Sequence, residues 1–257
     1  MIDIRPFASL GHADHGWLNA RHHFSFAGYH DPARVGWGAI RVWNDDTIAA
    51  QSGFPPHSHA DMEIVTFVRS GAITHKDSLG NTGRTGAGDV QVMSAGTGIT
   101  HAEYNLEAEP TTLFQIWIMP DRAGEQPSWG QRECPKAERS GTWVTLAAGD
   151  AVAGEVLPLR ADAKVAAARL SAGETLVYEA DPSRHLYLVA PTGRITVNGH
   201  AANPRDGIAV TGESLLQIRA EDDAEIVLVN ARYPARATSL LCALTRRCIS
   251  LRSCSRS

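Results

Sequence analysis

Two short segments of the sequence carry residues that commonly bind metals. The segment 53–63 contains His57 and His59, and the segment 98–105 contains His101 and Glu103. Successive side chains of a β-strand point to opposite faces, so each pair, two residues apart, would project from one face of its strand. Two paired strands could therefore direct three imidazoles and one carboxylate at a single point.

This ligand set has a recognisable chemistry. Three neutral imidazoles and a carboxylate suit a borderline divalent metal, and four protein ligands leave coordination positions open for water or substrate. The sequence therefore predicts one divalent ion, and Fe, Ni, Co, Cu, Mn and Zn are all compatible with the ligand set. A lone His-x-His pattern is common, but one followed roughly forty residues later by His-x-Glu is far more specific. An open coordination position indicates chemistry or ligand binding more than a structural metal.

A second carboxylate competes for the site. Glu63 follows His59 by four residues and would lie on the same face of its strand. Both Glu63 and Glu103 are sterically possible ligands.

The elements that would position these residues are β-strands. Short runs of alternating or apolar residues, separated by Gly, Asn and Asp, continue to about Pro120, and Gly36–Asp46 is one example. Residues 121–131 lack periodicity and indicate a linker. Strand-like runs resume at Trp143, so a second β domain follows the first. It contains only His185 and His200, without a His-x-His or His-x-Glu pattern, and we expect it to bind no metal.

Composition limits the classes of function. The 257 residues are 43% hydrophobic and 20% charged, which is ordinary for a globular protein. The formal charge is -4, but five arginines lie after Pro234, where there is no acidic residue, so the rest carries 19 basic and 28 acidic residues. An acidic body argues against direct nucleic-acid binding. No apolar run approaches the roughly 18 residues of a membrane span, and no secretory signal is evident at the N-terminus. We expect a cytoplasmic protein.

The cysteines support the same location. Three of the four lie in the Arg- and Ser-rich tail after Pro234, which leaves Cys134 alone in the body. This is no disulfide framework, and reduced thiols fit the cytoplasm. We expect the tail, 234–257, to be disordered and Cys134 to be inert.

The metal-binding segments resemble the cupin motifs. The longer strings Gly53-Phe-Pro-Pro-His-Ser-His, Gly86-Ala-Gly-Asp-Val-Gln-Val-Met-Ser-Ala-Gly-Thr-Gly-Ile-Thr-His-Ala-Glu and Gln115-Ile-Trp-Ile-Met-Pro resemble the pirin family specifically. The resemblance implies an all-β fold of two cupin (jelly-roll type) β-barrels in tandem, the first of which binds one divalent metal ion, with Fe expected. The expected domains are 1–120 and 141–233, joined by a linker at 121–140. Matched motif to motif, the metal ligands are His57, His59, His101 and Glu103, with Glu63 in a supporting or structural role.

The resemblance also implies a function. Bacterial pirins are associated with quercetin 2,3-dioxygenase activity, so we expect a metal-dependent dioxygenase that opens the heterocycle of a flavonol with O2. Glu103 would take the proton of the substrate hydroxyl. Animal pirins are nuclear Fe-dependent transcriptional co-regulators, so the alternative is a non-catalytic redox sensor that acts through a protein partner. A third possibility is an isomerase or another small-molecule cupin. We expect a monomer.

Overall fold

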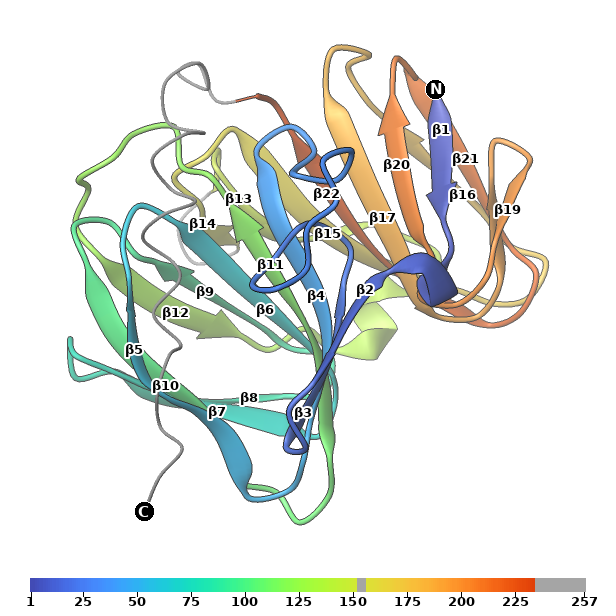
Figure 1. Cartoon of the computed structure of the whole chain (residues 1–257). Coiled ribbons are helices and arrows are strands. Elements are labelled where there is room, and N and C mark those ends of the chain that lie inside the picture. Colours follow the sequence, from blue (N-terminus) through green and yellow to red (C-terminus); the bar gives the residue numbers. More distant parts are fainter. Residues whose placement is uncertain (152–155, 234–257) are drawn as a thin grey trace.

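The computed structural model describes residues 1–151 and 156–233, and the tail expected to be disordered lies outside them. The described chain consists of β-strands and two short 3-10 helices, η1 (Phe7–Ser9) and η2 (Lys136–Arg139), as Figure 1 shows. In this part of the chain, no helix is long and apolar enough to cross a membrane. The expected all-β fold of two cupin domains is confirmed.

The first sandwich contains a seven-stranded sheet in the order β12-β9-β6-β11-β4-β3-β2 and a four-stranded sheet in the order β5-β10-β7-β8. Its strands are β2 (Gly11–Asp14), β3 (Leu18–His22), β4 (Ile40–Ile48), β5 (Ser52–His59), β6 (Glu63–Ser70), β7 (Ala72–Asp77), β8 (Thr82–Gly86), β9 (Val90–Ser94), β10 (Ile99–Asn105), β11 (Thr111–Ile118) and β12 (Ser128–Arg132).

The second sandwich repeats this plan, with sheets in the orders β1-β20-β17-β22-β15-β13-β14 and β16-β21-β18-β19. Its strands are β1 (Ile2–Arg5), β13 (Val144–Ala148), β14 (Leu157–Pro158), β15 (Ala163–Leu170), β16 (Thr175–Glu179), β17 (His185–Thr192), β18 (Ile195–Val197), β19 (His200–Ala202), β20 (Gly207–Thr211), β21 (Leu215–Ala220) and β22 (Ala224–Ala231). Aliphatic side chains from both sheets form its interior.

The two seven-stranded sheets also contribute to one shared hydrophobic core. Trp43 and Phe67 of the first sandwich belong to the same buried cluster as Tyr187 and Val229 of the second. Strand β6 is therefore buried at six consecutive positions, Glu63–Val68, because both of its faces are covered. A strand covered on both sides favours a continuous apolar run over alternation.

Two segments depart from the expected domain plan. Strand β1 pairs with β20 of the second sandwich, although its residues were expected in the first domain. Ile2 and Ile4 pack against the core of the second sandwich. Strand β12 lies inside the expected linker and pairs with β9 of the first sandwich. It is an edge strand without a fully buried position, so it lacks the periodicity that would have predicted it.

Candidate metal centre

Three neighbouring strands form the frame of the site. Strand β10 lies between β5 and β7. His101 is directly opposite His57 on β5 and opposite Asp77 on β7, while Glu103 is opposite His75 on β7. Cross-strand partners share a face of the sheet, so residues from three strands face the same space.

A bulge in β5 adjusts this register. His101 pairs with His57, but Glu103 pairs with Phe54, so Pro55 and Pro56 together lie opposite a single residue of β10. Proline has no backbone N–H to donate, and edge strands such as β5 tolerate it at bulges. The carbonyl of Pro55 accepts a hydrogen bond from Nδ1 of His57, at 2.8 Å. The two prolines therefore help to fix the orientation of the His57 ring.

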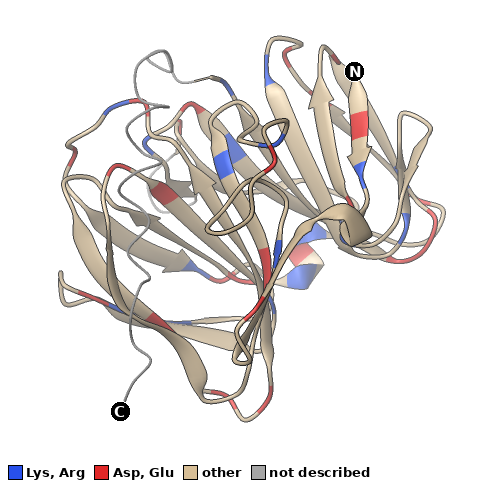
Figure 2. Ribbon diagram, in the orientation of Figure 1, with Lys and Arg blue, Asp and Glu red and all other residues tan. Residues whose placement is uncertain are grey.

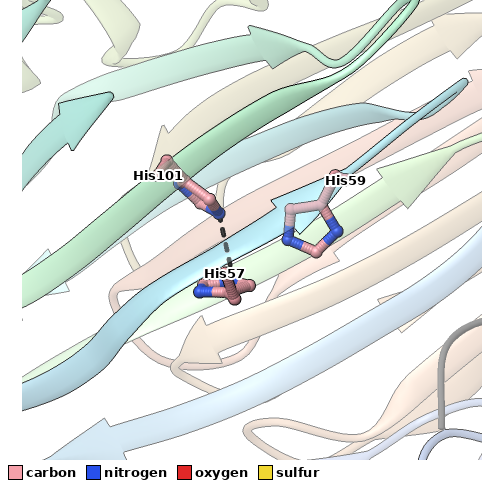
Figure 3. Close-up of side chains that lie close together, drawn as sticks. All are labelled: His57, His59 and His101. Atoms are coloured by element: carbon pink, nitrogen blue, oxygen red, sulfur yellow. Dashed lines mark hydrogen bonds between the residues drawn. The ribbon is translucent and has the colours of Figure 1, made fainter. Parts of the chain in front are cut away.

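The structure brings three of the four sequence-predicted ligands together. His57, His59 and His101 each offer a ring nitrogen within 4.8 Å of the other two. The Nε2 atoms of His57 and His101 are 3.1 Å apart, and Figure 3 shows the three rings on two neighbouring strands. The His59 ring centroid lies 4.8 Å from that of His57.

The electrostatics of this group suit a metal. Burial lowers the pKa of His59 to about 4, with a further contribution from His57. Burial also lowers the pKa of His101 to about 2, and the surrounding histidines add to the effect. His59 and His101 are therefore neutral at pH 7, as metal coordination requires. Because His57 Nδ1 faces a carbonyl oxygen, it carries the proton, and Nε2 presents a lone pair. The donor set fits a borderline divalent ion.

Glu103 lies beside this group and is held by amide donors. It is 2% exposed, and its Oε1 and Oε2 accept hydrogen bonds from Gln91 Nε2 at 2.6 Å and Gln115 Nε2 at 2.9 Å. Burial raises the pKa of Glu103 to about 7, although these bonds act in the opposite direction. Glu103 falls in a second group of potential ligands, with His75 and His101, whose atoms lie within 4.8 Å of one another.

Glu63 has a different environment. Its Oε2 accepts hydrogen bonds from Ser94 Oγ at 2.7 Å and from the backbone N–H of Arg160, in the second sandwich, at 3.1 Å. Within residues 1–151 and 156–233, it belongs to neither group of potential metal ligands. This carboxylate connects the two sandwiches.

His75 is a site residue that the sequence analysis missed. Its ring is completely buried and stacks on Trp129, with centroids 4.8 Å apart and planes 8° apart. Its Nε2 is 3.0 Å from Asp77 Oδ2, and its Nδ1 is 3.4 Å from Nδ1 of His101. The signal was present, because His75 and Asp77 are also spaced two residues apart on one strand.

Comparisons with known proteins agree with this architecture. Residues 4–118 match the family model described as Pirin, and residues 145–231 match the model described as Quercetinase C-terminal cupin domain. A Pseudomonas aeruginosa protein provisionally named quercetin 2,3-dioxygenase is 64% identical over 229 residues, which are 89% of this chain and 99% of that protein. The quercetin 2,3-dioxygenase of Escherichia coli K12 is 40% identical over 240 residues, covering 89% of this chain and 97% of the enzyme.

A solved structure adds a metal to the comparison. The Escherichia coli pirin YhhW in complex with nickel(II) superimposes with a TM-score of 0.85 and 39% identity, covering 91% of this chain and all of that chain (100%). With two matched domains and relatives aligned over nearly their full length, the chain belongs to the pirin family.

Proposed function

We propose that this protein is a metal-dependent dioxygenase that opens the heterocycle of a flavonol such as quercetin with O2. The observation that carries the proposal is the convergence of His57, His59 and His101 beside the buried carboxylate of Glu103. The names of the Escherichia coli and Pseudomonas aeruginosa relatives, and the nickel complex of the Escherichia coli pirin, support it. In the proposed site, the three histidines and Glu103 hold one divalent ion.

The role of each group follows from its chemistry. A bound divalent ion would polarise the hydroxyl and carbonyl oxygens of the flavonol and lower the pKa of the hydroxyl. Glu103 accepts the hydroxyl proton, and Gln91 and Gln115 hold its carboxylate in place. O2 is the oxidant: both of its atoms enter the ring-opened product, and one ring carbon leaves as carbon monoxide.

Aromatic side chains near the histidines support a flat aromatic substrate. Trp117 lies edge-on to His59, with ring centroids 4.9 Å apart, and Phe26 lies edge-on to Trp117 at 5.4 Å. Aromatic rings pair well with other rings in offset or edge-to-face geometry. Trp117 and Phe26 are accordingly the side chains that we propose contact the substrate rings.

The test is aerobic incubation of the metal-loaded protein with quercetin, following the loss of its near-visible absorption and the release of carbon monoxide. We expect turnover by the wild type, and a loss of at least about 100-fold in His101→Ala and Glu103→Gln, because each removes a ligand or the proton acceptor. His200→Ala, which changes an exposed histidine of the second sandwich, should retain full activity.

Metal analysis completes the experiment. We expect about one divalent ion per chain in the wild type and a large loss in His57→Ala. Absence of turnover with each of Fe, Ni, Co, Cu, Mn and Zn would overturn the dioxygenase proposal. Undiminished turnover in both His101→Ala and Glu103→Gln would overturn the assignment of the site.

A further inference from the structure

Beyond the predicted ligands, β7 contributes a hydrogen-bonded pair, His75 and Asp77, that reaches the far side of the His101 ring. Asp77 Oδ1 accepts hydrogen bonds from the backbone N–H groups of Leu79 at 2.9 Å and Asn81 at 3.0 Å. Its Oδ2 accepts a bond from Asn81 Nδ2 at 2.9 Å and faces His75 Nε2 at 3.0 Å. Every assigned neighbour of this carboxylate is a donor, so Asp77 acts only as an acceptor.

This arrangement determines where the protons of the two rings lie. Since Asp77 accepts, His75 Nε2 must carry a proton, and the Nδ1 of a neutral His75 is then an acceptor. That atom faces Nδ1 of His101 at 3.4 Å, so the His101 proton belongs on Nδ1. The Nε2 atom of His101 is left with a lone pair, which points toward Nε2 of His57.

The position of the proton on the His57 ring is determined in the same way, by a different acceptor. His57 donates from Nδ1 to the carbonyl of Pro55, so its Nε2 also presents a lone pair. The two Nε2 atoms are 3.1 Å apart, and two facing lone pairs repel unless a cation lies beside them. The opposite tautomer of His101 would relieve this repulsion, but it would either set the Nδ1 lone pairs of His101 and His75 against each other or turn the lone pair of His75 Nε2 against the carboxylate of Asp77.

We propose that Asp77 and His75 are positioning residues that hold His101 in the Nδ1–H tautomer, so that its Nε2 is available to bind the metal. This inference rests on the metal site of the proposed function. Groups that orient a metal ligand in this way typically change metal affinity by about 10–100-fold when they are lost.

The tautomers can be measured directly in the metal-free protein. Long-range ¹H–¹⁵N correlation spectra of ¹⁵N-histidine-labelled protein distinguish the two nitrogens of each ring. We expect the Nδ1–H form for His57 and His101 and the Nε2–H form for His75. In Asp77→Asn, the amide oxygen can still accept from Leu79 and Asn81, but an NH2 group faces His75. His75 and His101 should then both change tautomer, with His101 protonated on Nε2.

Metal affinity provides the second readout, with Ni²⁺ as the probe in competition with a chromophoric chelator. Asp77→Asn and His75→Leu should each weaken Ni²⁺ binding by about 10–100-fold. His75→Asn should restore much of the affinity, because its side-chain oxygen can occupy the place of Nδ1 and accept the proton of His101. Asp14→Asn is the matched control, since Asp14 accepts from the backbone N–H two residues later, as Asp77 does, but lies on β2. It should bind Ni²⁺ as the wild type does.

The outcomes separate this inference from the function on which it rests. If the wild type binds Ni²⁺ and Asp77→Asn changes neither the tautomer of His101 nor the affinity, the positioning role is wrong while the metal site stands. If the spectra show the expected tautomers but the wild type binds no Ni²⁺ or any other candidate metal, the proposed function fails instead. If His75→Asn binds as weakly as His75→Leu, His75 acts as a ligand or as packing, and the positioning role is again wrong.

Discussion

His101 links the two groups of potential ligands in the candidate metal centre. One ring nitrogen faces His57 and the other faces His75, and the residue lies on the central strand of three. It is 3% exposed, whereas His57 and His59 lie on the edge strand and are partly exposed. Burial therefore keeps His101 uncharged, and the two edge-strand histidines leave the site accessible from outside the sandwich.

The support of Glu103 by amides can be tested at Gln91. In Gln91→Leu, Oε1 of Glu103 keeps only the long contact with Thr66 at 3.4 Å. Leaving a buried carboxylate oxygen without its donor should cost about 1–3 kcal/mol of unfolding free energy. Quercetin turnover should fall because the carboxylate loses its orientation, whereas the loss of metal should be smaller than in His57→Ala because the three histidines are intact. Urea unfolding and metal analysis measure the two effects.

The matched control is Gln131→Leu on the exposed edge strand β12. Gln131 accepts one hydrogen bond from Thr85, whereas the carboxylate of Glu103 accepts from Gln91 and Gln115 instead. Its substitution should leave turnover close to the wild-type value. Equal losses in the Gln91 and Gln131 variants would show that the amide of Gln91 has no specific role.

Sequence spacing predicted which histidines of the candidate centre lie together, for a physical reason. Alternation along a strand fixes which side chains share a face, so the patterns at His57 and His101 were sufficient to predict a common site. The donors to Glu103 come from β9 and β11 in the opposite sheet, at Gln91 and Gln115. Contact across a sandwich has no local signature, and so neither glutamine was predicted.

At the scale of elements, the centre depends on how closely β5 approaches β10. Gly53 on β5 makes this approach possible, because a Cβ there would lie 2.2 Å from the carbonyl oxygen of Glu103 and 2.5 Å from the Cα of Tyr104. Both atoms belong to the backbone of β10, so neither can move aside easily. A side chain at this position must displace the edge strand instead.

We therefore expect Gly53→Ala to weaken the metal site more than the fold. Displacement of β5 would move His57 and His59 away from His101, and the affinity for Ni²⁺ should fall by about tenfold or more, because small displacements of ligands are costly in metal sites. The core is formed largely by other strands, so the melting temperature should change little. Gly28→Ala is the control, because a Cβ there meets no atom within 4 Å. Wild-type affinity in Gly53→Ala would contradict this account.

The elements that the sequence failed to predict share one property. Strands β1 and β12 each lie at the edge of a sheet, and β1 pairs with a strand about two hundred residues away in the chain. Strands β4 and β6 were predictable from their own apolar runs, because burial imposes the pattern locally. Pairing between distant segments depends on the assembled sheet, which a local pattern does not encode.

At the scale of the whole molecule, polar contacts accompany the shared core. Asp45 is completely buried and forms ion pairs with Arg69 of its own sandwich and Arg205 of the second. In the orientation of Figure 2, acidic and basic residues are interspersed over both sandwiches. The contact between the sandwiches therefore combines apolar packing with charges that must be paired to be buried.

His23 lies at this contact and should make stability depend on pH. It is completely buried and hydrogen-bonded through Nδ1 to the hydroxyl of Tyr187 at 2.9 Å, on the second sandwich. Burial holds the pKa of His23 well below its ordinary value, and the positive charges of Arg5, Arg34 and Arg205 lower it further. The folded protein therefore keeps this ring neutral at pH values where an exposed histidine is charged.

The sign of the pH effect follows from proton binding. Below about pH 6.5 the unfolded chain protonates His23 and the folded chain does not, so the free energy of unfolding should fall as the pH is lowered, by up to about 1.4 kcal/mol per pH unit for this one group. Other buried histidines act in the same direction, so the measurement is the difference between wild type and His23→Asn in urea unfolding at pH 8, 6.5 and 5, with chelator present. The variant should be less stable at pH 8 but lose less stability on acidification.

His200→Asn, at an exposed position, controls for the loss of a histidine and should keep the wild-type slope. Parallel curves for wild type and His23→Asn would show that the contact between the sandwiches does not depend on a neutral His23.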